Sequence, residues 1–168
     1  METTLLNDVQ TKLTTHFGEA IISAEQQYDF PVFIVKREKI IEILNFLKND
    51  PEMGFGFLTT LCGIHFPENK GKELCVMYQL HNLPKNLRIR LKIFFGINDA
   101  VVPTATTIWP AANWMERETY DFFGVVFKGH PNLKRILNMD EMNYFPLRKE
   151  YALEDNARED KNDAMFGR

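Results

Sequence analysis

The sequence predicts an α+β fold: an antiparallel-rich sheet of about four strands with helices packed against one face, followed by an extended C-terminal segment. Three stretches carry hydrophobic residues at helical spacing, and others alternate between hydrophobic and polar residues as half-buried strands do. The chain has 168 residues, of which 45% are hydrophobic and 26% charged. A chain of this length and composition can form one globular core without disulfides or metals.

Two helices and a strand are predicted in the first fifty residues. The first helix begins near Thr4 and ends at Gly18. A short hydrophobic run at 32–35 predicts a buried strand. The second helix covers residues 38–50, where an apolar stripe lies apart from the charged side chains, and it ends because the residue before Pro51 disfavours the helical conformation.

Three further strands are predicted before residue 96. Residues 55–64 form a mixed apolar run, and residues 73–80 alternate between hydrophobic and polar side chains. Residues 87–95 alternate most clearly, with five hydrophobic side chains on one face. This period-two pattern favours an antiparallel sheet with one packed face and one polar face.

Basic side chains form the polar face of the last of these strands. Arg88, Arg90 and Lys92 alternate with its hydrophobic residues. The row is either the solvated side of the sheet, which the residue types favour, or a surface that meets an acidic partner.

A third helix is predicted for residues 110–123. Its initial proline fits the first turn, where the missing N–H is not needed, and Thr106 or Thr107 is the predicted N-cap. Gly124 fits the left-handed position just past the helix end. Residues 125–127 then form a short extended piece.

The chain divides into a domain at 1–126 and an extended C-terminal segment with a charged tail at 127–168. Pro131 and Pro146 favour extended chain over helix in this segment. An extended chain reaches about 3.3–3.6 Å per residue, so the part up to Tyr151 can wrap far over a neighbour. Beyond it, hydrophobic residues thin out and charges alternate, so the tail cannot bury enough apolar surface to fold by itself.

The sequence contains no pattern for a cofactor, a metal or a nucleophile. The nine glycines form neither a dinucleotide loop nor a phosphate loop, and the four histidines lack metal-ligand spacing. Cys62 and Cys75 cannot supply the four thiolates of an iron–sulfur cluster. These isolated cysteines, without an N-terminal leader, indicate a reducing, cytoplasmic compartment. The net charge of −3 argues against nucleic acid as the main partner, and no apolar run approaches a bilayer span.

The densest polar constellation lies on the third predicted helix, from Trp114 to Gly124. Glu118 and Asp121 share a face and are candidates for the acid–base pair of an enzyme. Alternatively, Arg117 and Asp121 pair on a solvated helix surface. A third interpretation explains the mixture of charged and aromatic residues better: a patch buried against another subunit, whose groups compensate charges that would each cost several kcal/mol if unpaired.

This helix and the segment after it contain six motifs with fixed spacing. They are Trp-Pro-Ala-Ala-Asn-Trp at 109–114, Glu-Arg-Glu at 116–118, Asp-Phe-Phe-Gly at 121–124, Gly-His-Pro at 129–131, Arg-Ile-Leu at 135–137 and Pro-Leu-Arg-Lys at 146–149. These motifs resemble the 30-kDa subunit (the C subunit) of the proton-translocating NADH:quinone oxidoreductase, respiratory complex I. The resemblance covers roughly residues 30–151.

The resemblance implies a hydrophilic subunit of the peripheral arm that binds no cofactor and has no activity alone. FMN, iron–sulfur clusters and quinone would belong to partner subunits. The chain would dock on the 49-kDa-type subunit, which helps form the quinone site, and on other peripheral-arm subunits. It would reach the cytoplasmic side of the cell membrane only through the complex. The motif residues expected at the partner interface are Trp114, Glu116, Arg117, Glu118, Asp121, Phe122, Phe123, Gly124, His130, Pro131, Arg135 and Arg148.

The chain departs from the family pattern at three points. Tyr144-Phe145 replaces a Gly-His pair, Glu150 replaces an aspartate, and His65 stands where the family has an aspartate near the end of a central strand. Local conformation and partner contacts at these points stay open. Two other functions also stay open: a homologous scaffold subunit of a membrane-bound hydrogenase or plastid-type quinone oxidoreductase, and a stand-alone enzyme that uses the acidic pair of the third helix.

Overall fold

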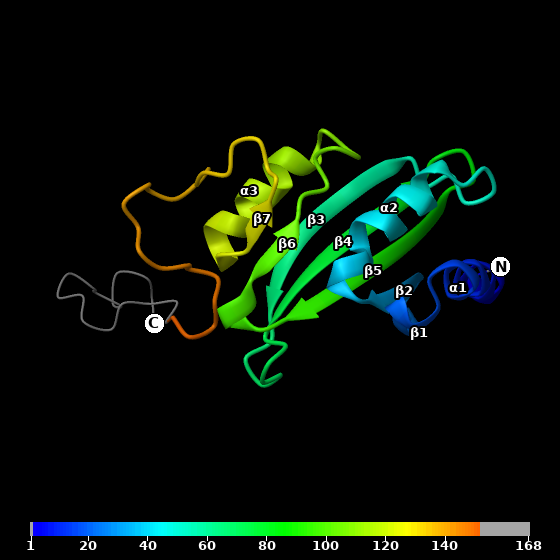
Figure 1. Cartoon of the computed structure of the whole chain (residues 1–168), viewed down its shortest axis with the longest axis horizontal. Helices are drawn as coiled ribbons and strands as arrows, with labels where there is room; N and C mark the ends of the chain where they lie inside the picture. Colours follow the sequence, from blue (N-terminus) through cyan, green and yellow to red (C-terminus); the bar gives the residue numbers. More distant parts are fainter. Residues whose placement is uncertain (1, 152–168) are drawn as a thin grey trace, which may run out of the picture.

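A computed structural model describes residues 2–151, which form a five-stranded sheet with α-helices on one face and a small two-stranded sheet beside it (Figure 1). The α+β prediction is confirmed. The charged tail predicted beyond Tyr151 lies outside the described residues. In chain order the elements are α1 (Glu2–Phe17), β1 (Ile21–Gln27), β2 (Phe30–Val35), α2 (Ile40–Asn49), β3 (Phe57–His65), β4 (Leu74–Asn82), β5 (Leu87–Phe95), β6 (Val101–Pro103), α3 (Ala112–Phe123) and β7 (Val126–Lys128).

The main sheet has the strand order β1-β2-β5-β4-β3. Its neighbouring strands are antiparallel except β2 and β5, which run parallel with Val32 opposite Arg90. The antiparallel-rich sheet is therefore confirmed, with one strand more than the predicted four. The additional strand, β1, is a mostly polar edge strand with no fully buried residue. The short extended piece predicted near residue 126 is β7, which pairs in parallel with β6.

One face of the sheet carries the hydrophobic core, which the three helices of the described region cover. Directly opposite residues of neighbouring strands share a face, so the inward set follows from the register. On β5, the predicted inward residues Ile89, Leu91 and Ile93 are fully buried. They join one core cluster with residues of all three helices, including Val9 of α1 and Leu44 of α2. Each such aliphatic side chain contributes about 1.5–3 kcal/mol through burial.

The start of α3 differs from the prediction. The helix begins at Ala112 without a side-chain cap, so the predicted N-cap at Thr106 or Thr107 is wrong. The preceding residues fold into a turn of their own, and the carbonyls of Trp109 and Pro110 accept from the first N–H groups of the helix. These donors are therefore satisfied by backbone, and no cap hydroxyl is needed.

Helix α3 packs closely on β3 at Gly63. A Cβ atom at this position would lie 2.5 Å from Cδ2 of Phe123 and 3.0 Å from Cγ2 of Thr119. Three residues form this contact, and only a residue without a side chain lets the helix lie so near the strand. At the end of α3, Gly124 has a φ of +75°, which confirms the predicted left-handed position.

We expect Gly63→Ala to lower the free energy of unfolding by about 1–3 kcal/mol, because the new methyl group would force Phe123 and Thr119 away from β3. Gly56→Ala is the matched control, since a Cβ atom there would meet no atom within 4 Å. Denaturant unfolding of the three proteins checks this. Equal midpoints for Gly63→Ala and the wild type would contradict the close approach.

Candidate functional site

The predicted interface residues lie where α3 meets the C-terminal segment, by which we mean residues 129–151. This segment contains no helix or strand in the described part of the chain, and it runs out from β7 past α3 as the orange trace of Figure 1. Its conformation therefore depends on side-chain contacts instead of a regular hydrogen-bond ladder. Those contacts come from the motif residues.

Asp121 is the centre of these contacts. Its side chain is fully buried in α3, and Oδ1 accepts from Nη1 of Arg135 at 2.7 Å. Oδ2 accepts from the backbone N–H groups of Ile136, Leu137 and Asn138 at 2.8–3.0 Å. Burial acts to raise the pKa of Asp121, but the three backbone bonds and the guanidinium outweigh it and hold the pKa well below its usual range. We call this arrangement the Asp121 clamp.

Arg135 extends the clamp along the C-terminal segment. Besides the Asp121 carboxylate, it donates to the carbonyls of Asp121 at 2.9 Å, Met142 at 2.7 Å and Tyr144 at 2.9 Å. Its guanidinium also lies 5.2 Å from the ring centroid of Phe145. One largely buried side chain thus fixes three parts of the chain.

Arg117 makes different contacts from those expected. The predicted pair between Arg117 and Asp121 is not formed, because Arg135 occupies the carboxylate. Arg117 instead donates to the backbone carbonyls of Lys134 at 3.2 Å and Arg135 at 3.0 Å. It therefore also holds the segment against α3.

Arg148 fastens the end of the segment to the C-terminus of α3. Its Nε donates to the carbonyl of Phe123 at 2.7 Å, where the helix presents unpaired carbonyls. Its guanidinium lies 4.6 Å from the ring centroid of Phe145. The ring also lies so near Gly124 that a Cβ atom there would be 2.5 Å from it. The next amide, that of Lys149, donates to Nδ1 of His65 at 2.9 Å.

Two of the departures from the family pattern thus take part in this docking. Phe145 lies against both arginines, and His65 accepts the bond that ties the segment to β3. Because Nδ1 of His65 accepts, its ring carries no proton on that nitrogen. The His65 contact could not be foreseen from the sequence, because its partner lies 84 positions away.

Glu116 is fully buried and anchors the loop before α3. One of its carboxylate oxygens accepts from the Thr104 hydroxyl at 2.5 Å, and the other accepts from the Ala105 N–H at 2.6 Å. Burial raises the pKa of Glu116 to about 7, although both hydrogen bonds favour the charged form. The side chain points into the protein, so its role is internal.

His130 and its neighbours complete the turn into the segment. The Nε2 atom of His130 lies 3.1 Å from the carbonyl of Asn113, and Nδ1 accepts from the Asn132 N–H at 3.0 Å. Pro131 beside it is exposed. The ring thereby links the beginning of α3 to the beginning of the C-terminal segment.

The acid–base pair of the enzyme interpretation is not formed. Asp121 is fully buried with both carboxylate oxygens engaged, while Glu118 is exposed three residues earlier. Phe122 and Phe123 are half-buried, and Phe123 lies against Gly63 of β3. Of the predicted interface residues, therefore, Glu116, Asp121, Gly124, Arg135 and Arg148 serve mainly to shape this region, whereas Trp114, Glu118 and Pro131 are open to solvent.

The same region exposes a set of large apolar side chains, of which only Trp114 is among the predicted interface residues. Leu137 and Met139 are 68% and 69% exposed, and Trp114 on α3 is 62% exposed. The exposed apolar set of this region consists of Trp114, Leu137, Met139, Tyr144, Leu147 and Tyr151. Their signal in the sequence was the recurrence of large apolar residues in a stretch that has no helical or strand period. Such a stretch cannot bury them in its own secondary structure.

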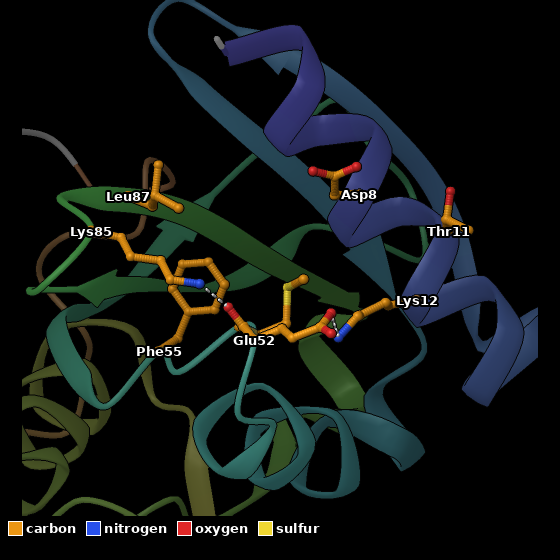
Figure 2. A pocket seen from close by; sticks show the side chains of 8 residues that line it. Asp8, Thr11, Lys12, Glu52, Phe55, Lys85 and Leu87 are labelled. Carbon is orange, nitrogen blue, oxygen red and sulfur yellow. Dashed lines mark hydrogen bonds and ion pairs between the residues drawn. The ribbon is translucent and has the colours of Figure 1, made fainter.

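A hollow of about 510 Å³ lies elsewhere, between α1 and the loop before β3 (Figure 2). Lys12 on its wall contacts Asp50 at 3.0 Å and Glu52 at 2.7 Å, and Nζ of Lys85 donates to the carbonyl of Glu52 at 2.6 Å. These charged groups already have partners in the chain. The ion pairs of Lys12 on the wall of the hollow thus link α1 to the loop before β3.

Between residues 6 and 151, whose side chains the structure describes, no three His, Cys, Asp or Glu side chains are grouped so that they could hold a metal ion. In the same range, no helix is both long and apolar enough to cross a membrane.

The sequence matches the family model described as the 30-kDa subunit of respiratory-chain NADH dehydrogenase over residues 33–157. One of two NADH-quinone oxidoreductase C subunits of Rhizobium meliloti (strain 1021) is 38% identical over 148 residues, which are 88% of this chain and 73% of that protein. The C subunit of the Roseiflexus sp. (strain RS-1) enzyme is 40% identical over 148 residues, 86% of this chain and 83% of the relative. That of Streptomyces coelicolor is 40% identical over 121 residues, but the match spans only 48% of its length.

Two solved structures share the fold. A trypsin-resistant fragment of Nqo5 superimposes with a TM-score of 0.63 at 28% identity, over 78% of this chain and 98% of the fragment. A chain of an archaeal membrane-bound sulfane sulfur reductase superimposes with a TM-score of 0.71 at 23% identity, over 88% of this chain and 85% of the other. The second likeness concerns the fold alone.

We expect Asp121→Asn to release the C-terminal segment, because the change leaves Arg135 without its carboxylate and places an amide group against three N–H donors. Removing one partner of a buried ion pair costs about 3–5 kcal/mol. Limited trypsin digestion should cleave the variant faster after Lys134 and Arg135. Glu118→Gln, on the same helix but exposed, should digest like the wild type. Wild-type kinetics for Asp121→Asn would contradict the clamp.

The raised pKa of Glu116 predicts a pH dependence of stability. Native protein keeps a proton up to about pH 7 that the unfolded chain, with an ordinary pKa of 4.5, has already lost. The contribution of this proton to the free energy of unfolding is fully present below pH 4.5. It falls by up to ~3 kcal/mol as the pH rises to about 7. The side chain of Glu116→Gln does not titrate. The free energy of unfolding of this variant, measured in denaturant, should therefore rise relative to that of the wild type between pH 4.5 and pH 7. A pH-independent difference would contradict the assignment.

Proposed function

The chain belongs to the family of the 30-kDa subunit of respiratory-chain NADH dehydrogenase, and we propose that it acts in such a complex as a non-catalytic brace of the peripheral arm. The observation that carries the proposal is the contrast within the C-terminal segment. Internal clamps fix its path, while its large apolar side chains remain exposed. A segment that only completed the fold would bury those side chains.

The exposed apolar set has the properties of a docking surface. Interface cores are enriched in aromatic residues and methionine, and the set includes Trp114, Met139 and Tyr144. Ordering a flexible segment on binding costs conformational entropy. Because the Asp121 clamp already orders the backbone of the C-terminal segment, binding does not have to offset this cost. A partner can therefore use the full apolar contact for affinity.

The proposed partner at this surface is the 49-kDa-type subunit, with the other peripheral-arm subunits around it. This choice follows the motif resemblance of α3 and the C-terminal segment. The predicted interface residues then have two roles. The buried ones shape the surface, and the exposed Trp114, Glu118 and Pro131 contact the partner directly. In the cell the chain would lie on the cytoplasmic side of the membrane, attached only through the complex.

We also propose that the chain binds no redox group and that FMN, the iron–sulfur clusters and quinone are held by its partners. The state of the cysteines supports this. Burial raises the pKa of the Cys62 thiol and raises that of Cys75 to about 12, so neither readily supplies a thiolate ligand. Electron transfer would then run through the neighbouring subunits.

A second candidate is the same scaffold role in a different membrane-bound respiratory complex. The observation that favours it is the fold shared with a chain of the sulfane sulfur reductase. The two candidates differ in the proteins that accompany the chain. An NADH-oxidising flavoprotein among them would decide for the NADH dehydrogenase.

The test is affinity isolation of the tagged full-length chain from solubilised native membranes. We expect the 49-kDa-type subunit and NADH:quinone reductase activity to co-purify with it. Trp114→Ser combined with Leu137→Ser should reduce this co-purification roughly tenfold, because both side chains lose apolar contact with the partner. Backbone bonds to Asp121 are untouched by these changes, so the variant should keep its melting temperature.

Leu83→Ser is the control, since Leu83 is equally apolar and exposed but lies in the turn between β4 and β5. It should co-purify as the wild type does. Two results would overturn the proposal: isolation of the wild-type chain without any respiratory subunit, or undiminished co-purification of the double variant.

A further inference from the structure

The face of the five-stranded sheet opposite the helices carries a second surface that the proposed function does not use. The register places one row of side chains across the whole sheet on this face: Cys62 of β3, Met77 of β4, Lys92 of β5, Ile34 of β2 and Ser23 of β1. The three α-helices contribute their buried hydrophobic residues to the core on the other side of the sheet. We call this side the open face.

Hydrophobic side chains of the open face lie outside the core. Ile34, Ile64, Met77 and Phe94 are all half-buried, yet they belong neither to the core cluster nor to the partly buried residues packed against it. Within the described chain, Phe94 has one aromatic neighbour, Phe66, at 5.8 Å between ring centroids. Val32 and Cys75 on the same face are fully buried, so the apolar atoms left partly open belong to these four side chains.

The cations of the open face have no anionic partner. Arg90 donates to the Gln79 side chain at 3.1 Å and lies 4.3 Å from the ring centroid of Phe30. Lys92 donates to the Gln27 side chain at 2.9 Å. Arg88 is exposed, and among the side chains that the structure describes, those of residues 6–151, no salt bridge joins any of these three to a carboxylate.

The open face differs in charge from the protein as a whole. The chain as a whole carries a net charge of −3, but this face has three adjacent cations on one strand. The register places a single carboxylate, Glu25 on the edge strand, in the row of Arg90 with β2 between them. Neutral amides hold Arg90 and Lys92 in place, and Gln27, which binds Lys92, also donates to Glu25.

A hollow of about 480 Å³ lies at one end of the open face. Its apolar wall includes Ile22, which is more than half exposed, together with Ile34 and Phe94. Lys72 also lines the hollow, as do the carboxylates of Glu38 and Asp99, both of which pair with Arg37. The hollow can accept one large apolar side chain beside the row of cations.

We propose that the open face is a second docking surface, covered in the assembled complex by a protein that presents carboxylates around an apolar anchor. The carboxylates would meet Arg88, Arg90 and Lys92, and the anchor would fill the hollow. A second copy of this chain fits poorly, because the two rows of cations would face each other. The chain would then join two partners, one on each side. The inference rests on the proposed function only in taking this partner to be a component of the same complex.

The test places a photo-cross-linking amino acid, p-benzoylphenylalanine, at position 77 of the tagged full-length chain and irradiates intact cells before isolation. We expect a cross-link to another protein, at a peptide rich in Asp and Glu. Arg88→Glu should reduce the yield roughly tenfold by turning attraction into repulsion, whereas Arg88→Lys, which keeps the charge, should retain it. Both changes are at an exposed position, so equal melting temperatures confirm that the fold is intact.

Each outcome bears on the inference. Cross-links only within the chain, to a second copy, to lipid or to nucleic acid would overturn it, as would a yield that is unchanged in Arg88→Glu. If the tagged chain brings respiratory subunits with it but position 77 reaches none, the open face is free and the proposed function stands. A cross-link to an acidic protein when no respiratory protein co-purifies would support the docking surface and refute the proposed function.

Discussion

The buried carboxylate of Asp121 is the group on whose hydrogen bonds the path of the C-terminal segment depends. A segment without helix or strand has few backbone bonds of its own, so its groups must find partners elsewhere. Asp121 supplies them by accepting three consecutive amides and the guanidinium of Arg135, which in turn binds carbonyls farther along the segment. A buried ion pair whose atoms are fully hydrogen-bonded can fix the course of a segment that has no secondary-structure propensity to define it.

The helices and central strands could be predicted from the sequence because their periodicity is local. Strand β1 could not, since Ile21–Gln27 is a mostly polar edge strand that pairs only with β2. The N-cap prediction at Thr106 or Thr107 failed because the helix begins only at Ala112, and the Thr106 hydroxyl bonds to that of Thr104 instead. Parallel pairing of β2 with β5 joins segments far apart in the sequence, which no local pattern reveals.

The candidate site could be located but not explained from the sequence. The motifs marked α3 and the C-terminal segment, and the mixture of charges with aromatic residues indicated an interface. We expected a partner subunit to compensate the charges of this helix. For Glu116 and Asp121 this is not so, because their hydrogen-bond partners come from this chain. Residues such as Asp121 and Arg135, 14 positions apart, meet only because the segment folds back, so their pairing has no sequence period.

The central claim is that this chain builds its docking surface by itself, before any partner binds. Hydrogen–deuterium exchange of the isolated chain, resolved to the amides of Ile136, Leu137 and Asn138, measures this most directly. The account predicts that these three amides exchange far more slowly than those of an unstructured peptide. Exchange at the unstructured rate would show that the surface forms only on assembly and would contradict the account.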